Sequence, residues 1–379
     1  MDASPRRVPL FDIKAEQAGF AAELRRRLDA VLAHCQFILG PEVAELEDRL
    51  ATWCGAAHCI GVSSGTDALL IALMAEGVGE GDAVFLPAFT YTATAEVPLL
   101  LGAMPVFVDI DPHTFQIDPA DLARRVSVVR QAGKFHPRAL IGVDLFGQPA
   151  DWAALEEVAR TDHLFMLDDA AQSFGASFHN RRLGTFGNAT AVSFFPTKPL
   201  GAYGDGGALF TESEERAALY RSLRSHGEGT TRYEVLRIGI NGRLDTLQAA
   251  VLLARFTQFD AALAARETVA RTYDRVLSGI VETPRRVPDS TSVWAIYSVL
   301  LPDAPTRARV QQALAAAGIG SNIYYPRPLH RQPAYAAHHD GTPLPVSDSI
   351  SQRILALPMH PGLEEADIIR IAEVLRTAL

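Results

Sequence analysis

The sequence predicts an α/β protein whose large domain is a mostly parallel, doubly wound sheet, followed by a smaller α+β domain. Short β-rich runs alternate with helical patterns over the first two-thirds of the 379-residue chain, and such repeated units favour parallel pairing. Several runs are apolar without alternation, which is typical of strands covered on both faces. Ligands in such sheets bind outside the carboxyl ends of the strands. The expected strands are residues 58–62, 83–87, 105–109, 139–145, 164–167, 189–194 and 208–211.

Helical patterns separate these strands and continue after the last of them. A long pattern over residues 244–276 is expected to lead out of the large domain, and a strand over 294–301 follows it. We therefore place the two domains at residues 1–255 and 256–379. A proline-rich loop over residues 324–345 lies in the second domain, and long ordered loops are often functional. The other expected helices are residues 66–75, 92–102, 119–132, 152–160, 212–224, 306–317 and 364–379.

Composition excludes several classes of function. Hydrophobic content of 48% and charged content of 21% describe a soluble globular protein. A net charge of -9 argues against nucleic-acid binding, which needs a basic face. The three cysteines form no CxxC pair, so we expect reduced thiols in a cytoplasmic protein without a zinc site. No membrane span is expected, because the longest apolar stretch, residues 97–108, falls short of about 20 residues.

Lys198 is the residue that most directly indicates a catalytic function. It follows the strand-like run 189–194 and precedes a Gly-rich turn over residues 201–207. Burial in such a place would lower the pKa of the ammonium group and expose a nucleophilic amine, as in a Schiff-base lysine. On this segment alone, an ordinary surface lysine at a strand end is the commoner alternative.

Two acidic residues, Asp168 and Asp169, end another apolar strand. Adjacent residues on a strand face opposite sides, so one of them is expected to face a site while the other caps or pairs elsewhere. An acid here and a lysine on a later strand fit pyridoxal phosphate (PLP), because the carboxylate keeps the pyridine nitrogen protonated and the ring acts as an electron sink. Metal binding is the alternative, but no ligand spacing accompanies the pair.

Two further strand ends carry candidate contacts. Gly65 permits close backbone approach in the turn 63–69, and free N–H groups at the helix start there would attract phosphate. A plain N-cap is the alternative. Tyr91 follows another strand and could stack on a flat ring, although core packing is the commoner use of an aromatic side chain.

Together these motifs resemble the nucleotide-sugar aminotransferases of the DegT/DnrJ family, which have the aspartate aminotransferase fold (fold type I). The resemblance covers residues 10–379, and the combination of motifs is specific although each is weak alone. It implies a PLP-dependent transferase that works as a homodimer. The motifs are GTDAL at 65–69, DAAQ at 169–172, SFFxxKxLG at 193–201, GDGG at 204–207 and GxNxRL at 239–244.

The resemblance also implies catalytic roles around the cofactor ring. Lys198 would bind PLP covalently, and Asp169 would meet the pyridine nitrogen. Gln172 would lie near the phenolic oxygen, and Tyr91 would stack on the ring. Some relatives are dehydratases with histidine at the lysine position, so Lys198 favours transamination.

The cofactor phosphate would be held by Gly65, Thr66 and Ser193. In the family, the loop that carries Asn241 reaches the phosphate site of the partner subunit, which would make the homodimer the catalytic unit. Arg243 from the same loop would then lie near the substrate.

A finer resemblance concerns the substrate. DLFGQ at 144–148, DAAQSFGA at 169–176, RLDTLQAA at 243–250 and YPxPLHxQPAY at 325–335 are similar to the branch that aminates UDP-2-acetamido-2-deoxy-3-keto-glucuronic acid. Its carboxylate and diphosphate would suit a cationic cluster in which Arg243 is the bidentate partner. L-Glutamate would be the donor, and the 3-amino sugar would serve glycan biosynthesis such as that of O-antigen. The implied substrate-binding residues are Arg243, Tyr325, Arg327, His330 and Arg331.

Three alternatives stay open at this point. The enzyme could aminate another position or a dTDP-linked keto sugar. It could be a PLP-dependent sugar dehydratase. From a different class, it could be a sensor that binds a nucleotide sugar without turnover, although no DNA-binding module is visible in the sequence.

Overall fold

A seven-stranded sheet forms the centre of the computed structural model, which describes residues 6–231 and 233–379. The strand order is β1-β9-β8-β5-β4-β2-β3. Pairing is parallel from β8 through β5, β4 and β2 to β3, whereas β9 runs antiparallel to both of its neighbours. The mostly parallel sheet is therefore confirmed. The strands are β1 His58–Val62, β2 Asp82–Pro87, β3 Met104–Val108, β4 His136–Val143, β5 Phe165–Asp169, β8 Ala189–Ser193 and β9 Gly207–Thr211.

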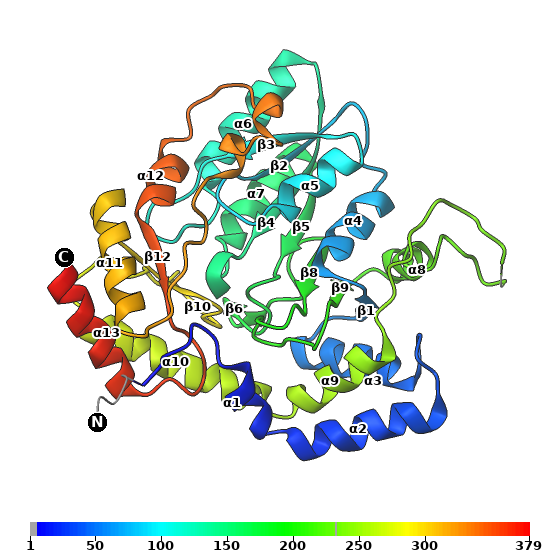
Figure 1. Cartoon of the computed structure of the whole chain (residues 1–379). Helices are drawn as coiled ribbons and strands as arrows, with labels where there is room; N and C mark the ends of the chain where they lie inside the picture. The colour runs from blue at the N-terminus through cyan, green and yellow to red at the C-terminus, as the bar shows by residue number, and fades with distance from the viewer. Residues whose placement is uncertain (1–5, 232) are drawn as a thin grey trace.

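Helices cover both faces of this sheet (Figure 1). One face packs against α3 (Pro41–Cys54), α6 (Pro119–Ala132), α7 (Trp152–Asp162) and α9 (Thr246–Phe256). The other packs against α4 (Gly65–Ala75), α5 (Ala93–Leu100) and α8 (Glu214–Leu223). Burial on both sides explains why the strands are apolar without alternation.

The C-terminal part has a separate apolar core. It gathers α10 (Phe259–Val276), α11 (Ala304–Ala316) and α13 (Glu365–Ala378) around the antiparallel pair β11 (Tyr297–Leu300) and β12 (Ile354–Leu357). The long pattern over residues 244–276 forms two helices, because the chain breaks at Thr257 and Gln258 before α10 turns toward this core. The division into residues 1–255 and 256–379 stays a prediction.

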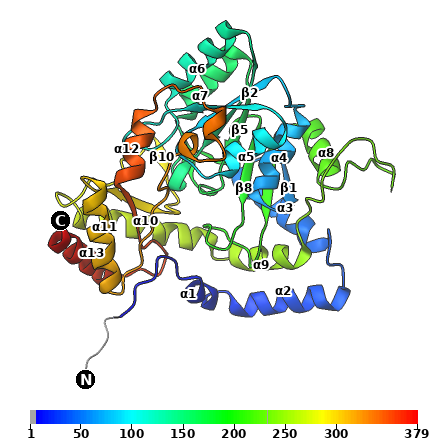
Figure 2. The ribbon, with the colours of Figure 1, turned by 45° about the horizontal axis from the view of Figure 1, so that its top comes forward.

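The N-terminal segment links the two parts of the chain. Val8 bridges to Ile319 beside the C-terminal core, and Arg6 forms ion pairs with Glu364 and Asp367. The chain then crosses to the large sheet through α1 (Ile13–Ala18) and α2 (Ala21–His34), and α2 lies along α9 (Figure 2). These N-terminal helices were not among the expected elements.

The remaining elements are short. A three-stranded sheet joins β6 (Ser177–Phe178), β7 (Arg181–Arg182) and β10 (Ser290–Thr291). Three 3₁₀ turns, η1 (Leu145–Gly147), η2 (Leu329–Arg331) and η3 (Ala336–His338), and helix α12 (Pro345–Arg353) complete the fold. In the described part of the chain, no helix combines the length and the apolar character that crossing a bilayer requires.

Candidate active site

The candidate site is a cavity of about 360 Å³ at the carboxyl ends of the parallel strands. It opens just beyond β1, β2, β4, β5 and β8, the edge at which an α/β sheet receives its ligands. The fold therefore gathers residues from five strand ends that are far apart in sequence. The expected site residues that line the cavity are Gly65, Thr66, Tyr91, Asp169, Gln172, Ser193, Lys198 and Tyr325.

Lys198 lies on the turn that follows β8. Its N–H donates to the carbonyl of Phe195 at 2.8 Å, and the turn closes where the Ala202 N–H donates to the carbonyl of Phe194. A Cβ on Gly201 would lie 2.4 Å from the carbonyl oxygen of Pro196, so this tight turn requires glycine. Burial lowers the pKa of the Lys198 ammonium to about 8, although Asp169 opposes the shift. The amine is therefore available as a nucleophile near neutral pH.

Asp169 faces the cavity from the end of β5. Its Oδ1 accepts from the Ala171 N–H at 3.2 Å, and its Oδ2 accepts from the Thr94 hydroxyl at 3.1 Å. Burial raises the pKa of this carboxyl, whereas the Ala171 N–H and the Lys198 ammonium act in the opposite direction. Asp168 points to the opposite face of the strand, where its side chain is fully buried and accepts from Thr190. The alternation expected for the pair is confirmed.

The amino end of α4 opens toward the cavity. Ser64 caps the helix by accepting from the Asp67 N–H at 3.0 Å, and Gly65 is its first residue. A Cβ on Gly65 would lie 2.7 Å from the Cβ of Ser193, so only glycine lets the helix start approach the end of β8 so closely. Free N–H groups and the helix dipole at this position suit an anion such as a phosphate.

A polar bridge connects the end of β5 to the proline-rich loop. Gln172 accepts from the Phe146 N–H at 2.8 Å and donates to the hydroxyl of Tyr325 at 3.1 Å. The Tyr325 ring lies edge-on to Phe89 and 6.3 Å from the exposed ring of Tyr91, measured between ring centroids. The loop therefore forms one aromatic wall of the cavity.

The expected cationic cluster does not form within this chain. His330 is buried beside Asp348, with 3.2 Å between Nε2 and Oδ1. Arg331 donates to the same carboxylate with two nitrogens, at 3.1 and 2.8 Å. The turn η2 directs both side chains toward α12, so they do not line the cavity, and neither does the exposed Arg327. The three residues do not line this cavity in the single chain, and their role in substrate binding stays a prediction.

Asn241 and Arg243 do not line the cavity of their own chain, although their loop is bonded to the turn after β1, where the Ser63 N–H donates to the carbonyl of Gly242 at 2.9 Å. Arg243 donates to the Oδ1 of Asn241 from Nε at 3.1 Å and from Nη2 at 2.7 Å. The segment between α8 and this loop exposes several apolar side chains, among them Val235 and Ile238. The roles expected for Asn241 and Arg243 stay predictions.

Sequence reasoning missed several residues of the cavity wall. Asp205 lies inside the GDGG motif at 204–207, so its position was signalled although no role was assigned. Thr94, which lies behind the cavity and donates to Asp169, was not singled out. Phe11 comes from the N-terminal segment, and no local pattern connects it to the strand ends. The unassigned wall residues include Phe11, Ser64, Thr90, Ala171, Thr197, Asp205, Ala295, Ile296 and Tyr324.

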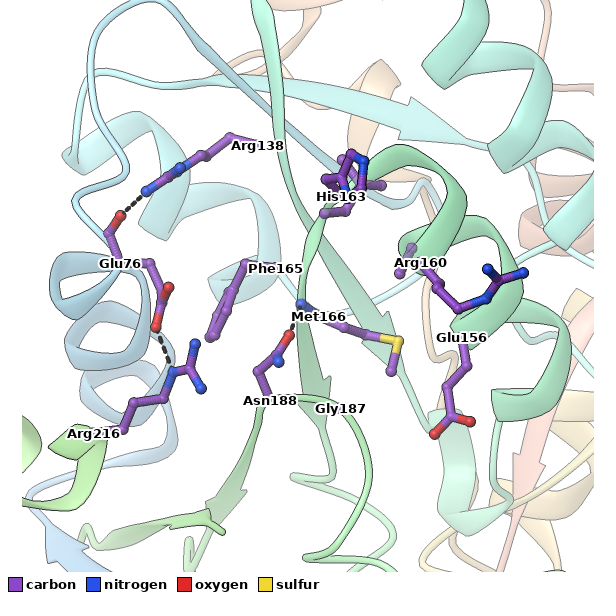
Figure 3. Close-up of a pocket in the computed structure, with 12 residues that line it drawn as sticks. Glu76, Arg138, Glu156, Arg160, His163, Phe165, Met166, Gly187, Asn188 and Arg216 are labelled. Carbon is purple, nitrogen blue, oxygen red and sulfur yellow. Dashed lines mark hydrogen bonds and ion pairs between the residues drawn. The ribbon is translucent and has the colours of Figure 1, made fainter. Parts of the chain in front are cut away.

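A larger hollow of about 580 Å³ lies at the opposite, amino ends of β4 and β5 (Figure 3). Arg216 donates to the carboxylate of Glu76 at 2.6 Å, and Arg138 donates to the carbonyl of the same residue. Asn188 accepts from the Met166 N–H. These polar groups already bind one another, and no lysine lines the hollow, so it is not the candidate active site.

A metal centre finds no support in the geometry. Among residues 6–231 and 233–379, no three His, Cys, Asp or Glu side chains are placed to hold a metal ion together. The carboxylate and the amine in the cavity are instead arranged for organic chemistry on a ring with an anionic tail.

The chain belongs to the DegT/DnrJ/EryC1/StrS aminotransferase family, which it matches over residues 20–376. Enzymes of this family are PLP-dependent sugar aminotransferases. The chain is 44% identical to UDP-2-acetamido-2-deoxy-3-oxo-D-glucuronate aminotransferase of Pseudomonas aeruginosa, over 95% of this chain and 97% of that protein. It is 40% identical to a pleiotropic regulatory protein of Geobacillus stearothermophilus, over 97% and 99% of the two chains.

A solved structure confirms the fold. The chain superposes with a TM-score of 0.95 on a DegT DnrJ EryC1 StrS aminotransferase from Brucella abortus, at 44% identity over 97% of this chain and 98% of that one. The protein is thus a PLP-dependent aminotransferase of fold type I.

The residues that line the cavity are arranged to hold PLP. The start of α4 offers N–H groups to the phosphate, and the close approach at Gly65 leaves no room for a side chain there. Lys198 supplies a buried amine, and Asp169 supplies a carboxyl group on the same wall. Tyr91 and Tyr325 offer flat surfaces to a ring.

We predict that Lys198 of the cofactor-free protein reacts with an amine-directed reagent with a midpoint near pH 8, because burial lowers its pKa to about 8. The chain has three lysines, and the exposed Lys14 and Lys134 serve as internal references. Asp169→Asn should move the midpoint to lower pH, since the Asp169 carboxylate favours the charged ammonium. Labelling of each lysine is measured by mass spectrometry. A Lys198 midpoint that coincides with those of the reference lysines would contradict the burial of a free amine.

Proposed function

We propose that this enzyme transfers the amino group of L-glutamate to carbon 3 of UDP-2-acetamido-2-deoxy-3-keto-glucuronic acid, giving a 3-amino sugar for cell-surface glycans. The observation that supports the proposal most directly is that Lys198 and Asp169 line the same cavity. The substrate rests on the 44% identity to the P. aeruginosa enzyme and on the four segments that resemble that branch. Amination of a different keto sugar is the principal alternative.

The chain's own residues divide the work of transamination. PLP, when bound, supplies an aldehyde that exchanges between amines and a ring that withdraws electrons from the reacting carbon. Lys198 anchors the cofactor, and its amine then moves a proton at the reacting carbon as general base and acid. Asp169 holds the proton on the ring nitrogen. Gln172 orients the phenolic oxygen, since its amide is already fixed by Phe146 and Tyr325.

Other residues hold the cofactor and exclude water. We assign the phosphate to Gly65, Thr66 and Ser193, which meet at the start of α4. Tyr91 would cover the ring, and Tyr325 would close the side nearest the proline-rich loop. Each of these roles follows from position in the cavity and from the family resemblance.

The active unit in this proposal is a homodimer. Asn241 and Arg243 do not line the cavity of their own chain, and the segment before their loop exposes apolar side chains such as Val235 and Ile238. From that position Asn241 would reach the phosphate of the partner's cofactor, and Arg243 would bind the carboxylate of the sugar. Two guanidinium nitrogens of Arg243 already hold one amide oxygen, a geometry that also suits a carboxylate.

A sensor without turnover is the second candidate, because the 40% identical relative is a regulatory protein. The presence of Lys198 and Asp169 in one cavity argues for chemistry instead, since ligand binding alone does not require an amine beside a carboxyl group. The two candidates differ in one outcome: whether nitrogen enters the sugar.

The reaction is tested with a panel of UDP- and dTDP-linked keto sugars and isotopically labelled L-glutamate. We expect labelled nitrogen in the UDP-linked 3-keto uronic acid, detected by mass spectrometry, and no transfer by Lys198→Ala. Loss of a sugar hydroxyl without nitrogen gain would indicate a dehydratase. Binding of the sugar without any transfer would indicate the sensor.

Sharing of active sites is tested by mixing two inactive variants. Lys198→Ala chains and Arg243→Ala chains should restore activity in heterodimers, because one site then combines an intact Lys198 with an intact Arg243. Recovery should approach about half of the wild-type activity per dimer if the two sites act independently. Heterodimers are counted by native mass spectrometry with one chain tagged. Heterodimers that form but stay inactive would mean that Arg243 serves its own chain.

A further inference from the structure

Asp168 occupies an unusual position directly behind the cavity. Its side chain is fully buried on the face of β5 opposite to Asp169. One carboxyl oxygen, Oδ2, accepts from the Thr190 hydroxyl at 3.1 Å. The other, Oδ1, is buried and has no hydrogen-bond donor facing it. A buried carboxylate oxygen without a donor is costly, whereas a protonated carboxyl group would itself be a donor at that atom.

Asp144 is the neighbour that could receive such a proton. It follows β4, whose Gly142 pairs with Asp168, and its N–H donates to the carbonyl of Asp169 at 3.2 Å. Its carboxyl group is also fully buried, and it interacts directly with that of Asp168. The two acids therefore face each other across adjacent strands.

The surroundings of Asp144 favour its ionised form. Oδ1 accepts from the Ala150 N–H at 2.6 Å and from the Trp152 indole at 3.1 Å, and Oδ2 accepts from the Ser173 hydroxyl at 3.1 Å. Three donors converge on one carboxyl group, which is the pattern of a carboxylate. Asp168 has a single donor, so the proton belongs on Asp168.

In the described part of the chain, no cation is among the strongest influences on either acid. The charged groups that act most strongly on Asp168 are Asp144 and Asp169, and both are acidic. Two buried carboxyl groups in contact cannot both ionise, so they share one proton. Burial raises the pKa of both carboxyl groups, and the charge of Asp144 raises that of Asp168 further.

We propose that Asp168 is a positioning residue that stays a neutral carboxylic acid and donates its proton to Asp144. The neutral acid leaves Asp169 as the one residue at the end of β5 that carries negative charge, as the ring nitrogen of the cofactor requires. An ionised Asp168, one residue away, would oppose the charge on Asp169. This inference rests on the proposed role of Asp169.

The acid pair also fixes the turn that leaves the strand. Ser173, which donates to Asp144, directly follows Gln172, and Gln172 holds Tyr325 in the cavity wall. The shared proton therefore joins β4, β5 and the Gln172 turn behind the cofactor site. This arrangement explains why two consecutive acids at one strand end have different tasks.

Infrared spectroscopy of the holoenzyme tests the shared proton. The wild type at neutral pH should show the stretch of a protonated carboxyl group, with the shift in deuterium oxide that an acid proton causes. Asp168→Asn should remove this band and retain turnover within about threefold, because its amide donates the same hydrogen bond to Asp144. Asp144→Asn should lose the band and at least about tenfold in turnover, because an amide cannot accept from all three donors. Asp168→Ala has no group that can donate a hydrogen bond to Asp144, so its turnover should fall as that of Asp144→Asn does. Normal turnover in Asp168→Asn but not in Asp168→Ala would show that this hydrogen bond is what Asp168 contributes.

Two results would overturn the proposal. One is a wild-type spectrum that lacks the band of the protonated carboxyl group, which would mean that both acids are ionised. This measurement needs no variant, so it tests the protonation of Asp168 even if Asp168→Asn does not fold. The other is an Asp168→Asn enzyme as impaired as Asp169→Asn, for which we expect a loss of about 10²-fold or more. If instead the proposed role of Asp169 is wrong, the result is different: Asp169→Asn would be active, and the infrared band of the protonated carboxyl group would still be present.

Discussion

The structure depends on placing a half-buried lysine and a buried carboxylic acid at one edge of a parallel sheet. Removing a charged group from water costs on the order of several kcal/mol, and the opposite charges of the two residues offset part of this cost. Burial lowers the pKa of Lys198 and raises that of Asp169, and each partner opposes the shift of the other. The cavity is therefore electrostatically prepared for a cofactor that brings a positive ring nitrogen and a negative phosphate.

The sheet satisfies this constraint through strand order. β5 and β8 are adjacent and parallel, so the acid that ends one and the lysine that follows the other reach the same edge. The start of α4 approaches the end of β8 because Gly65 has no side chain, which adds an anion site to the same cavity. Asp144 and Asp168 lie on the protein side of this edge, where a shared proton lets two more acids be buried without a cation.

The strands, the central helices and most of the cavity residues could be predicted from local sequence patterns, because their conformation depends on residues close to them in the chain. Lys198 and Asp169 could be found since each follows an apolar strand, and period-two alternation separated Asp169 from Asp168. His330 and Arg331 could not be placed, because their common partner, Asp348, lies in α12 beyond the loop. The break between α9 and α10 was also missed, since a continuous Ala- and Leu-rich pattern does not show where a helix must turn to reach a second core.

The central claim is that Lys198 is the covalent anchor of PLP. Reduction of the purified holoenzyme with borohydride, followed by proteolysis and mass spectrometry, tests it most directly, because reduction fixes the cofactor to the residue that holds it. Our account predicts a pyridoxyl group on the peptide that contains Lys198 and on no other lysine. A pyridoxyl group on Lys14 or Lys134, or a reduced protein that carries none, would contradict it.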